Sequence, residues 1–200
     1  GDEIEISLKM HGTSQRTGYL PVLKGYKRTF IDWLLRRDGT PIYDWGYVSG
    51  TRRTVLDGYD GGFYGSNAFR ESHAKQFEGK LLKGETVYYE VVGFTDTGAP
   101  IMATCNNKKL NDKEFIKQYG EETVFSYGCE PNPIHIVEEV NHEKWGKGVS
   151  VSSTPQSDMY VYRMTITNED GDVVEYTPDF MRYRCEQMGV KCVPVFWTGF

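Results

Sequence analysis

A chain of 200 residues, 38% of them hydrophobic and 26% charged, is long enough to bury one sizeable core, so we expect a single globular domain over residues 1–200. No apolar run approaches the roughly 20 residues that cross a bilayer, and the acidic N-terminus is unlike a signal peptide, which predicts no membrane partner. The formal net charge of −5 argues against a protein that coats nucleic acid indiscriminately, but not against one that binds a nucleic-acid end through local basic clusters. Such clusters occur at Lys24–Arg28, Arg36-Arg37, Arg52-Arg53 and Lys108-Lys109.

The first half of the chain predicts strands and two helices. Residues 3–9 alternate polar and apolar side chains, as a half-buried strand does, and the turn-forming group His11–Ser14 follows, with a return strand over 16–23. Apolar residues at helical spacing predict a helix over 27–37, ended by Asp38-Gly39. We further expect a strand pair over 42–56 around Trp45-Gly46, a glycine-rich loop over 57–67, and a helix from Ser66 or Asn67 to about Leu82. Its inner side would carry Phe69, His73, Phe77 and Leu81.

The second half predicts further strands and two more helices. The β-rich run 86–92 precedes a hairpin turn at Asp96–Gly98, and a capping box at Asn111 starts a short helix that ends near Gly120. A long irregular segment over 128–157 carries no recognised motif. The remaining elements are a strand over 159–167, its hairpin partner over 172–176, a helix over 177–188 and a strand over 191–197. Without regular βαβ alternation, the fold class is α+β with antiparallel sheets flanked by helices.

The cysteines give no sign of a metal site. The chain has 4 cysteines and 4 histidines, all dispersed and without a C-x-x-C pair. Zinc sites need clustered ligands, and disulfide scaffolds are denser in cysteine. We therefore expect free thiols, a reducing compartment and a cytoplasmic location.

The sharpest local feature is the stretch Lys9-Met10-His11-Gly12-Thr13-Ser14. A lysine at the end of a strand, followed by a glycine turn, projects its amine at the wall of a pocket. A neutral lysine amine can attack phosphorus, and the backbone N–H groups and hydroxyls of the turn suit phosphate oxygens. K-x-x-G alone is a weak pattern, and a surface lysine before a turn is the competing interpretation.

This stretch resembles motif I of the covalent nucleotidyltransferases, the superfamily of ATP-dependent ligases and mRNA-capping enzymes. The Gly-Thr-Ser ending is most similar to RNA ligases of the phage and RNA-editing type. Lys9 is then the expected catalytic nucleophile and Gly12 a nucleotide-binding residue. His11 is a possible additional contact, although a turn-forming histidine without a catalytic role is an equal alternative.

Four further stretches follow in the order of that family. Ser49–Thr54 resembles motif Ia, in which an arginine contacts phosphate or the RNA end, and Arg53 is favoured over Arg52. Val87–Phe94 resembles motif III, which implies that Glu90 accepts a hydrogen bond from the ribose of ATP, with metal binding by Glu90 as a further possibility. A satisfied strand carboxylate is the alternative.

Tyr160–Met164 resembles motif IIIa, in which an aromatic side chain stacks on the purine. Tyr162 is favoured, with Tyr160 as the alternative, and both could instead belong to the core. Residues 177–199 are similar to the approach to motif IV. The chain ends at Phe200 without motifs IV and V, so we expect a domain that is incomplete at its C-terminus. The sequence does not indicate whether residues 1–200 alone are active.

The resemblance implies an ATP-dependent RNA ligase of RNA repair. ATP and Mg²⁺ would be its cofactors, lysyl-AMP its intermediate, and RNA ends with 5′-phosphate and 3′-hydroxyl its partners. Alternatives are a DNA ligase of the same superfamily, a capping guanylyltransferase, and a noncatalytic nucleotide- or RNA-binding module. The sequence indicates neither the form of the RNA substrate nor an oligomeric state.

Overall fold

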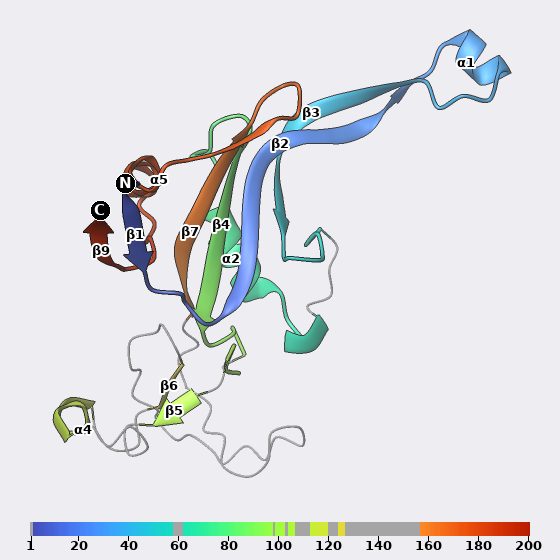
Figure 1. Ribbon diagram of the computed structural model, residues 1–200. Helices are drawn as coiled ribbons and strands as arrows, with labels where there is room; N and C mark the ends of the chain where they lie inside the picture. Colours follow the sequence, from blue (N-terminus) through green and yellow to red (C-terminus); the bar gives the residue numbers. More distant parts are fainter. Residues whose placement is uncertain are drawn as a thin grey trace.

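The computed structural model describes residues 2–57, 62–97, 99–102, 104–106, 113–119, 124–126 and 157–200, and its strands pair antiparallel in three sheets (Figure 1). The strands are β1 (Ile4–Ser7), β2 (Thr13–Lys27), β3 (Thr40–Gly50), β4 (Glu85–Gly93), β5 (Thr104–Asn106), β6 (Val124–Ser126), β7 (Ser157–Thr167), β8 (Val173–Glu175) and β9 (Val195–Gly199). The helices are α1 (Phe30–Leu34), the 3₁₀ turn η1 (Gly62–Tyr64), α2 (Ala68–Lys75), α4 (Lys113–Tyr119) and α5 (Pro178–Met188). The α+β class with antiparallel sheets is therefore confirmed.

The main sheet has the strand order β3-β2-β4-β7-β8, with β4 at its centre. Along β4 the side chains alternate, and Val87, Tyr89 and Val91 are fully buried. They share one apolar core with Phe69, Phe77 and Leu81 from the α2 region and with Met181, Cys185 and Met188 from α5. Both helices consequently cover the same face of the sheet, and the side chains of Tyr88 and Glu90 point to the opposite face.

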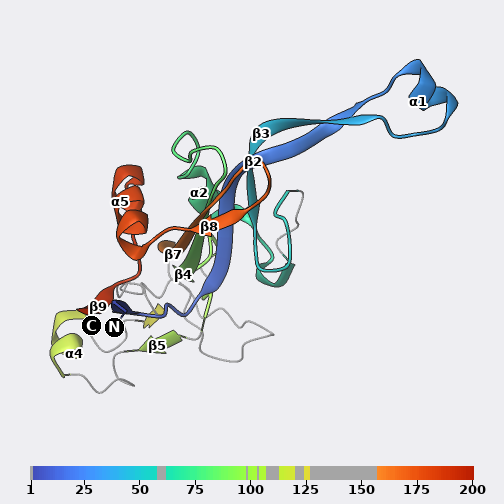
Figure 2. The ribbon, with the colours of Figure 1, turned by 45° about the horizontal axis from the view of Figure 1, so that its top comes forward.

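The remaining strands form two small sheets. β1 pairs with β9, so the first and last strands of the described chain lie side by side (Figures 1 and 2). β5 pairs with β6 in a separate two-stranded sheet. Among the residues that the structure describes, none of the helices has the length and apolar character needed to cross a bilayer.

Helix α5 is fixed at both ends by capping residues. The Thr177 side chain accepts a hydrogen bond from the backbone N–H of Phe180, Pro178 occupies the first turn, and Gly189 ends the helix in the left-handed conformation at φ 67°. The buried Arg184 ties α5 to the start of β4 through the carboxylate of Glu85, with N–O distances of 2.8 and 2.9 Å.

Four predicted elements differ from the structure. The strand pair around Trp45-Gly46 is wrong, because β3 runs unbroken through Gly46 and pairs with β2 along its length. Tyr19 stacks on Tyr47 at a ring distance of 4.7 Å, and this contact favours the continuous ladder. The helix expected to reach Leu82 ends at Lys75 and continues to Lys80 as successive i→i+3 turns.

The other two differences concern element length. The helix expected over 27–37 is the shorter α1, closed by a capping box between Thr29 and Asp32. The last strand begins at Val195 rather than Lys191. The irregular segment predicted over 128–157 lies outside the described residues except for Ser157, as do residues 58–61 of the expected loop.

Candidate functional site

Lys9 is held at the rim of a cavity by its two neighbours in sequence. The backbone N–H of Leu8 donates to the Pro194 carbonyl oxygen at 2.8 Å, which continues the β1–β9 pairing. Met10 is 8% exposed and packs with Val92 and Val193 in a small second core. Lys9 lies between these two anchored neighbours and lines the cavity with them.

Gly12 packs directly against β4. Its backbone N–H donates to Oε1 of Glu90 at 3.0 Å, and a Cβ atom added at this position would lie 2.2 Å from the Val91 carbonyl oxygen. Only glycine allows this close approach of two backbones. The turn after Lys9 is thereby fixed to the same strand that carries Glu90.

Burial raises the pKa of Glu90, and this outweighs the opposing effects of the Gly12 hydrogen bond and of the charge on Lys9. The cost of burial is smaller for a carboxylate that can accept further hydrogen bonds. A bound molecule with hydroxyl groups in the cavity would supply such donors.

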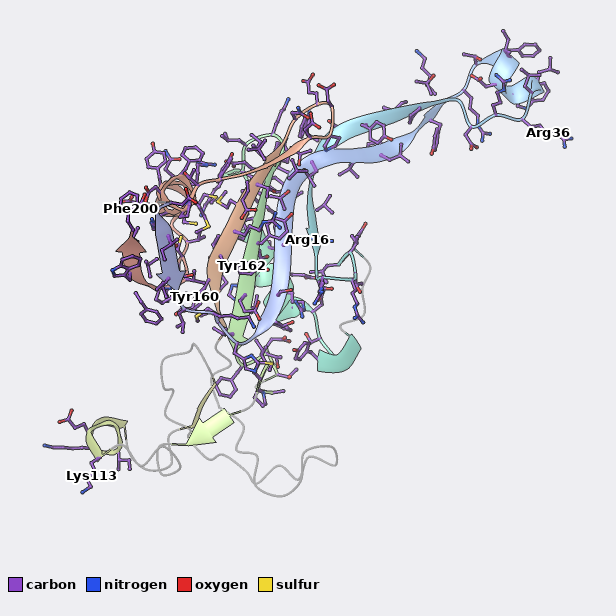
Figure 3. All side chains as sticks on the ribbon, in the orientation of Figure 1. Arg16, Arg36, Lys113, Tyr160, Tyr162 and Phe200 are labelled. Atoms are coloured by element: carbon purple, nitrogen blue, oxygen red, sulfur yellow. The ribbon has the colours of Figure 1, made fainter. Side chains whose placement is uncertain are left out.

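The cavity lies on the face of the main sheet opposite the helices and has a volume of about 630 Å³. Such volumes are typical of sites for small molecules and cofactors. Its walls include these residues from segments far apart in sequence: Lys9, His11, Ser14, Arg16, Arg52, Tyr88, Glu90, Tyr162 and Val193. Figure 3 shows Arg16 on β2 and Tyr162 on β7 on either side of β4.

The two arginines of the predicted motif Ia separate in the structure. Arg52 lines the cavity, whereas Arg53 is exposed and is not among the lining residues. Both lie in a tight turn closed by a hydrogen bond from the backbone N–H of Thr51 to the Thr54 carbonyl oxygen at 2.7 Å. The arginine favoured by the sequence pattern is therefore not the one that lines the cavity.

The two tyrosines of the predicted motif IIIa also occupy different environments. Opposite β4, Tyr88 pairs with Arg163 and Tyr89 with Val161, so Tyr162 is the extra residue of a β-bulge. A bulge re-aims a side chain, and Tyr162 lines the cavity with 42% of its surface exposed. Tyr160 packs against the second core beside the cavity.

Arg70 is a residue of this region that the sequence pattern did not reveal. It is 4% exposed, its Nη2 donates to Thr13 Oγ1 at 2.6 Å, and its carbonyl oxygen accepts from Gln15 Nε2 at 2.9 Å. It braces the start of β2 from the helix side of the sheet. A lone arginine in a helix next to a buried phenylalanine is ordinarily a solvated residue, so the sequence carries no signal for this role.

Positive charge predominates on the cavity walls. Lys9, Arg16 and Arg52 face one carboxylate, Glu90, although the whole chain carries a net charge of −5. This local excess of cations, with Tyr88 and Tyr162 beside them, suits an anionic ligand with a flat ring. Among the described residues no group of three His, Cys, Asp or Glu side chains is arranged to hold a metal ion.

Comparison with protein-family models gave no match, and comparison with curated protein sequences gave no significant match. The chemistry of the cavity itself is therefore the basis for a function.

Proposed function

We propose that the chain is the nucleotide-binding core of an ATP-dependent RNA ligase, in which Lys9 becomes covalently joined to AMP. One observation carries this proposal. One cavity is lined by four residues that resemble residues of four separate ligase motifs: Lys9, Arg52, Glu90 and Tyr162. The first and last of them are 153 positions apart in the sequence. Such convergence is not expected of four chance matches.

In the proposed first step the neutral amine of Lys9 attacks the α-phosphorus of ATP. A P–N bond forms, the bond from the α-phosphorus to the bridging oxygen breaks, and pyrophosphate leaves with the electron pair while the amine loses a proton to solvent. The cations of Arg16 and Arg52 stabilise the charge that develops on the phosphate oxygens.

In the proposed later steps the AMP moiety moves to RNA. An oxygen of the 5′-phosphate attacks the same phosphorus, the P–N bond breaks, and the released Lys9 amine takes up a proton. The 3′-hydroxyl of a second end then attacks the 5′-phosphate and loses its proton, while the P–O bond to AMP breaks and AMP leaves with the electron pair. The Glu90 carboxylate would accept a hydrogen bond from the ribose, and Tyr162 would stack on the adenine. RNA rather than DNA is proposed on the Gly-Thr-Ser ending of the lysine motif.

Mg²⁺ would neutralise phosphate charge on the leaving pyrophosphate. Among the described residues that line the cavity, Glu90 is the one carboxylate. Mg²⁺ commonly binds through one or two carboxylates together with substrate phosphates and water, so these residues are compatible with a metal carried in by ATP.

Incubation with Mg²⁺ and ATP, followed by intact mass measurement, tests the nucleophile. We expect the mass of one AMP moiety to be added, and Lys9→Ala to abolish the addition while leaving thermal unfolding unchanged. Lys75→Ala, which removes an exposed lysine from α2, is the matched control and should retain the adduct. A folded protein that neither forms an adduct nor gains thermal stability with ATP would contradict the proposal.

Removing the ring of Tyr162 should weaken nucleotide binding. Stacking of a base on an aromatic side chain is worth about 1–3 kcal/mol, so Tyr162→Ala should raise the Kd for ATP roughly 5- to 150-fold. Tyr162→Phe keeps the ring and should bind nearly as well. Calorimetric titration of both variants measures this, with Tyr183→Ala as a control for loss of an exposed tyrosine on α5. Equal affinities for Tyr162→Ala and Tyr162→Phe would exclude the stacking role.

A further inference from the structure

A two-stranded arm, residues 22–44, extends from the main sheet and carries α1 at its tip (Figures 1 and 2). The pairing of β2 with β4 ends at Gly18, and beyond this residue β2 is paired with β3 alone. The 15 residues of β2 span about 50 Å at ~3.4 Å per residue. The arm therefore places its tip far from the hydrophobic core.

The tip exposes apolar side chains on an ordered helix. α1 has no buried residue, and its capping box holds it in shape, with the Thr29 N–H donating to Asp32 Oδ2 at 2.8 Å. The exposed apolar residues are Phe30, Ile31, Trp33, Leu34 and Leu35, between 52% and 74% exposed. An exposed apolar group of this kind on a formed element indicates a binding surface.

The tip is also rich in arginine. Arg28, Arg36 and Arg37 surround a hollow of about 480 Å³ whose other walls include Trp33. The Asp38 carboxylate pairs with Arg28 at 3.4 Å, and the Asp32 carboxylate is engaged in the helix cap. Neither Arg36 nor Arg37 forms an ion pair within the part of the chain that the structure describes.

Arg36 adopts φ 53°, which makes it the one non-glycine residue with positive φ in the described chain. The position follows the end of α1, where glycine or asparagine is usual. A side chain at positive φ costs of order 1 kcal/mol, and residues held there cluster at functional sites. An arginine at this position is consistent with a guanidinium that serves a ligand rather than the fold.

We propose that the arm tip binds an RNA strand, with phosphates at Arg28, Arg36 and Arg37 and a base against Trp33. Guanidinium groups bind phosphate in a bidentate manner, and bases stack on aromatic side chains and arginine. The carboxylates of the tip are already engaged, Asp32 in the helix cap and Asp38 with Arg28. Arg36 and Arg37 therefore suit the phosphates of an anionic strand, which the apolar residues alone would not select. The identification of the strand as RNA rests on the proposed ligase function. The binding of a polyanion at the tip is independent of that function.

The spacing between the tip and the cavity sets a length requirement. Arg16 lines the cavity and Lys27 lies 11 residues farther along β2, which is about 36 Å. At ~3.4 Å per nucleotide, the rise of a stacked helical strand, roughly eleven nucleotides span this distance. A stacked strand of at least this length, with its end in the cavity, reaches the arm.

Fluorescence anisotropy with a labelled oligoribonucleotide, measured as a function of salt, tests the proposal. The double variant Arg36→Gly/Arg37→Ala should weaken binding of RNA longer than this span roughly tenfold per lost charged contact and reduce the salt slope by about 1 for each. Trp33→Ala should weaken binding without changing the salt slope. Lys75→Ala, remote from the arm, should have no effect on either quantity.

Stability and the AMP adduct separate this inference from its alternatives. Arg36→Gly removes the strained side chain, so thermal stability should be kept or raised while RNA affinity falls. All arm variants should still form the AMP adduct, since they leave the cavity intact. Unchanged RNA affinity in the double variant would overturn the proposal. Light scattering gives a second contrary outcome. If the wild-type chain is oligomeric, and the arm variants dissociate the oligomer without affecting RNA binding, the tip contacts a second copy and the proposal is overturned.

Discussion

Replacing Arg184 with leucine should destabilise the protein by about 3–5 kcal/mol, because it leaves a buried carboxylate without its charged partner. Glu85 is 0% exposed, and Arg184 donates to both of its carboxylate oxygens. Two further donors complete the set, the Leu82 N–H at 2.7 Å and the Tyr176 hydroxyl at 3.0 Å. The change should lower the urea midpoint without altering the adduct chemistry of the molecules that remain folded.

Arg163→Leu is the matched control for this prediction. Arg163 pairs with Glu175 at 2.9 Å, but both side chains are about half exposed, and an exposed ion pair contributes less than about 1 kcal/mol. Equal losses for Arg163→Leu and Arg184→Leu would show that burial of the Glu85 pair is unimportant.

Acid should remove the same stabilisation. Burial raises the pKa of Glu85, but the hydrogen bonds from Arg184 and the Leu82 backbone outweigh burial and hold the pKa below its ordinary value of 4.5. The ionised carboxylate therefore stabilises the native state above pH 4.5, and this contribution is lost as the pH falls through the lower native pKa. The Arg184→Leu variant should show a weaker loss of stability over that pH range.

Local patterns in the sequence were sufficient for most of the sheet and for α5. The β-rich run 86–92, the strand over 159–167 and the helix over 177–188 follow from short-range signals, and each element forms within two residues of its predicted ends. The hairpin turn was misplaced at Trp45-Gly46 because a glycine beside an aromatic residue is compatible with either a turn or a strand. Only the long-range pairing with β2 distinguishes the two.

The candidate site was predictable to the level of the motif but not of the individual side chain. Adjacent arginines are equivalent in sequence, and the turn after β3 decides that Arg52 rather than Arg53 lines the cavity. The bulge at Tyr162 depends on the register between two strands and has no local signature. The hydrogen bonds of Arg70 with Gln15 and of Arg184 with Glu85 join residues at least 55 positions apart. The hydrophobic periodicity of a single helix or strand does not indicate such contacts.

Gly12→Ala should reduce formation of the AMP adduct on the order of a hundredfold. The added Cβ would lie 2.2 Å from the Val91 carbonyl oxygen and 2.8 Å from Val92 Cγ1, so the turn must move away from β4 by about 1 Å. That movement breaks the 3.0 Å hydrogen bond from the Gly12 N–H to Glu90 and shifts the nearby Lys9. Displacement of a reacting group by about 1 Å can cost 10²-fold in rate.

Gly46→Ala makes the same chemical change in β3 and should leave the adduct rate nearly unchanged. Its Cβ would meet only the Val22 side chain, at 3.1 Å, which can rotate or shift. Quenched-flow sampling with mass detection gives the rate, and circular dichroism reports whether each variant is folded. A folded Gly12→Ala protein that reacts as fast as Gly46→Ala would mean that close packing of this turn on β4 does not position Lys9. The nucleophile would then have to be held by the anchoring of Leu8 and Met10 alone.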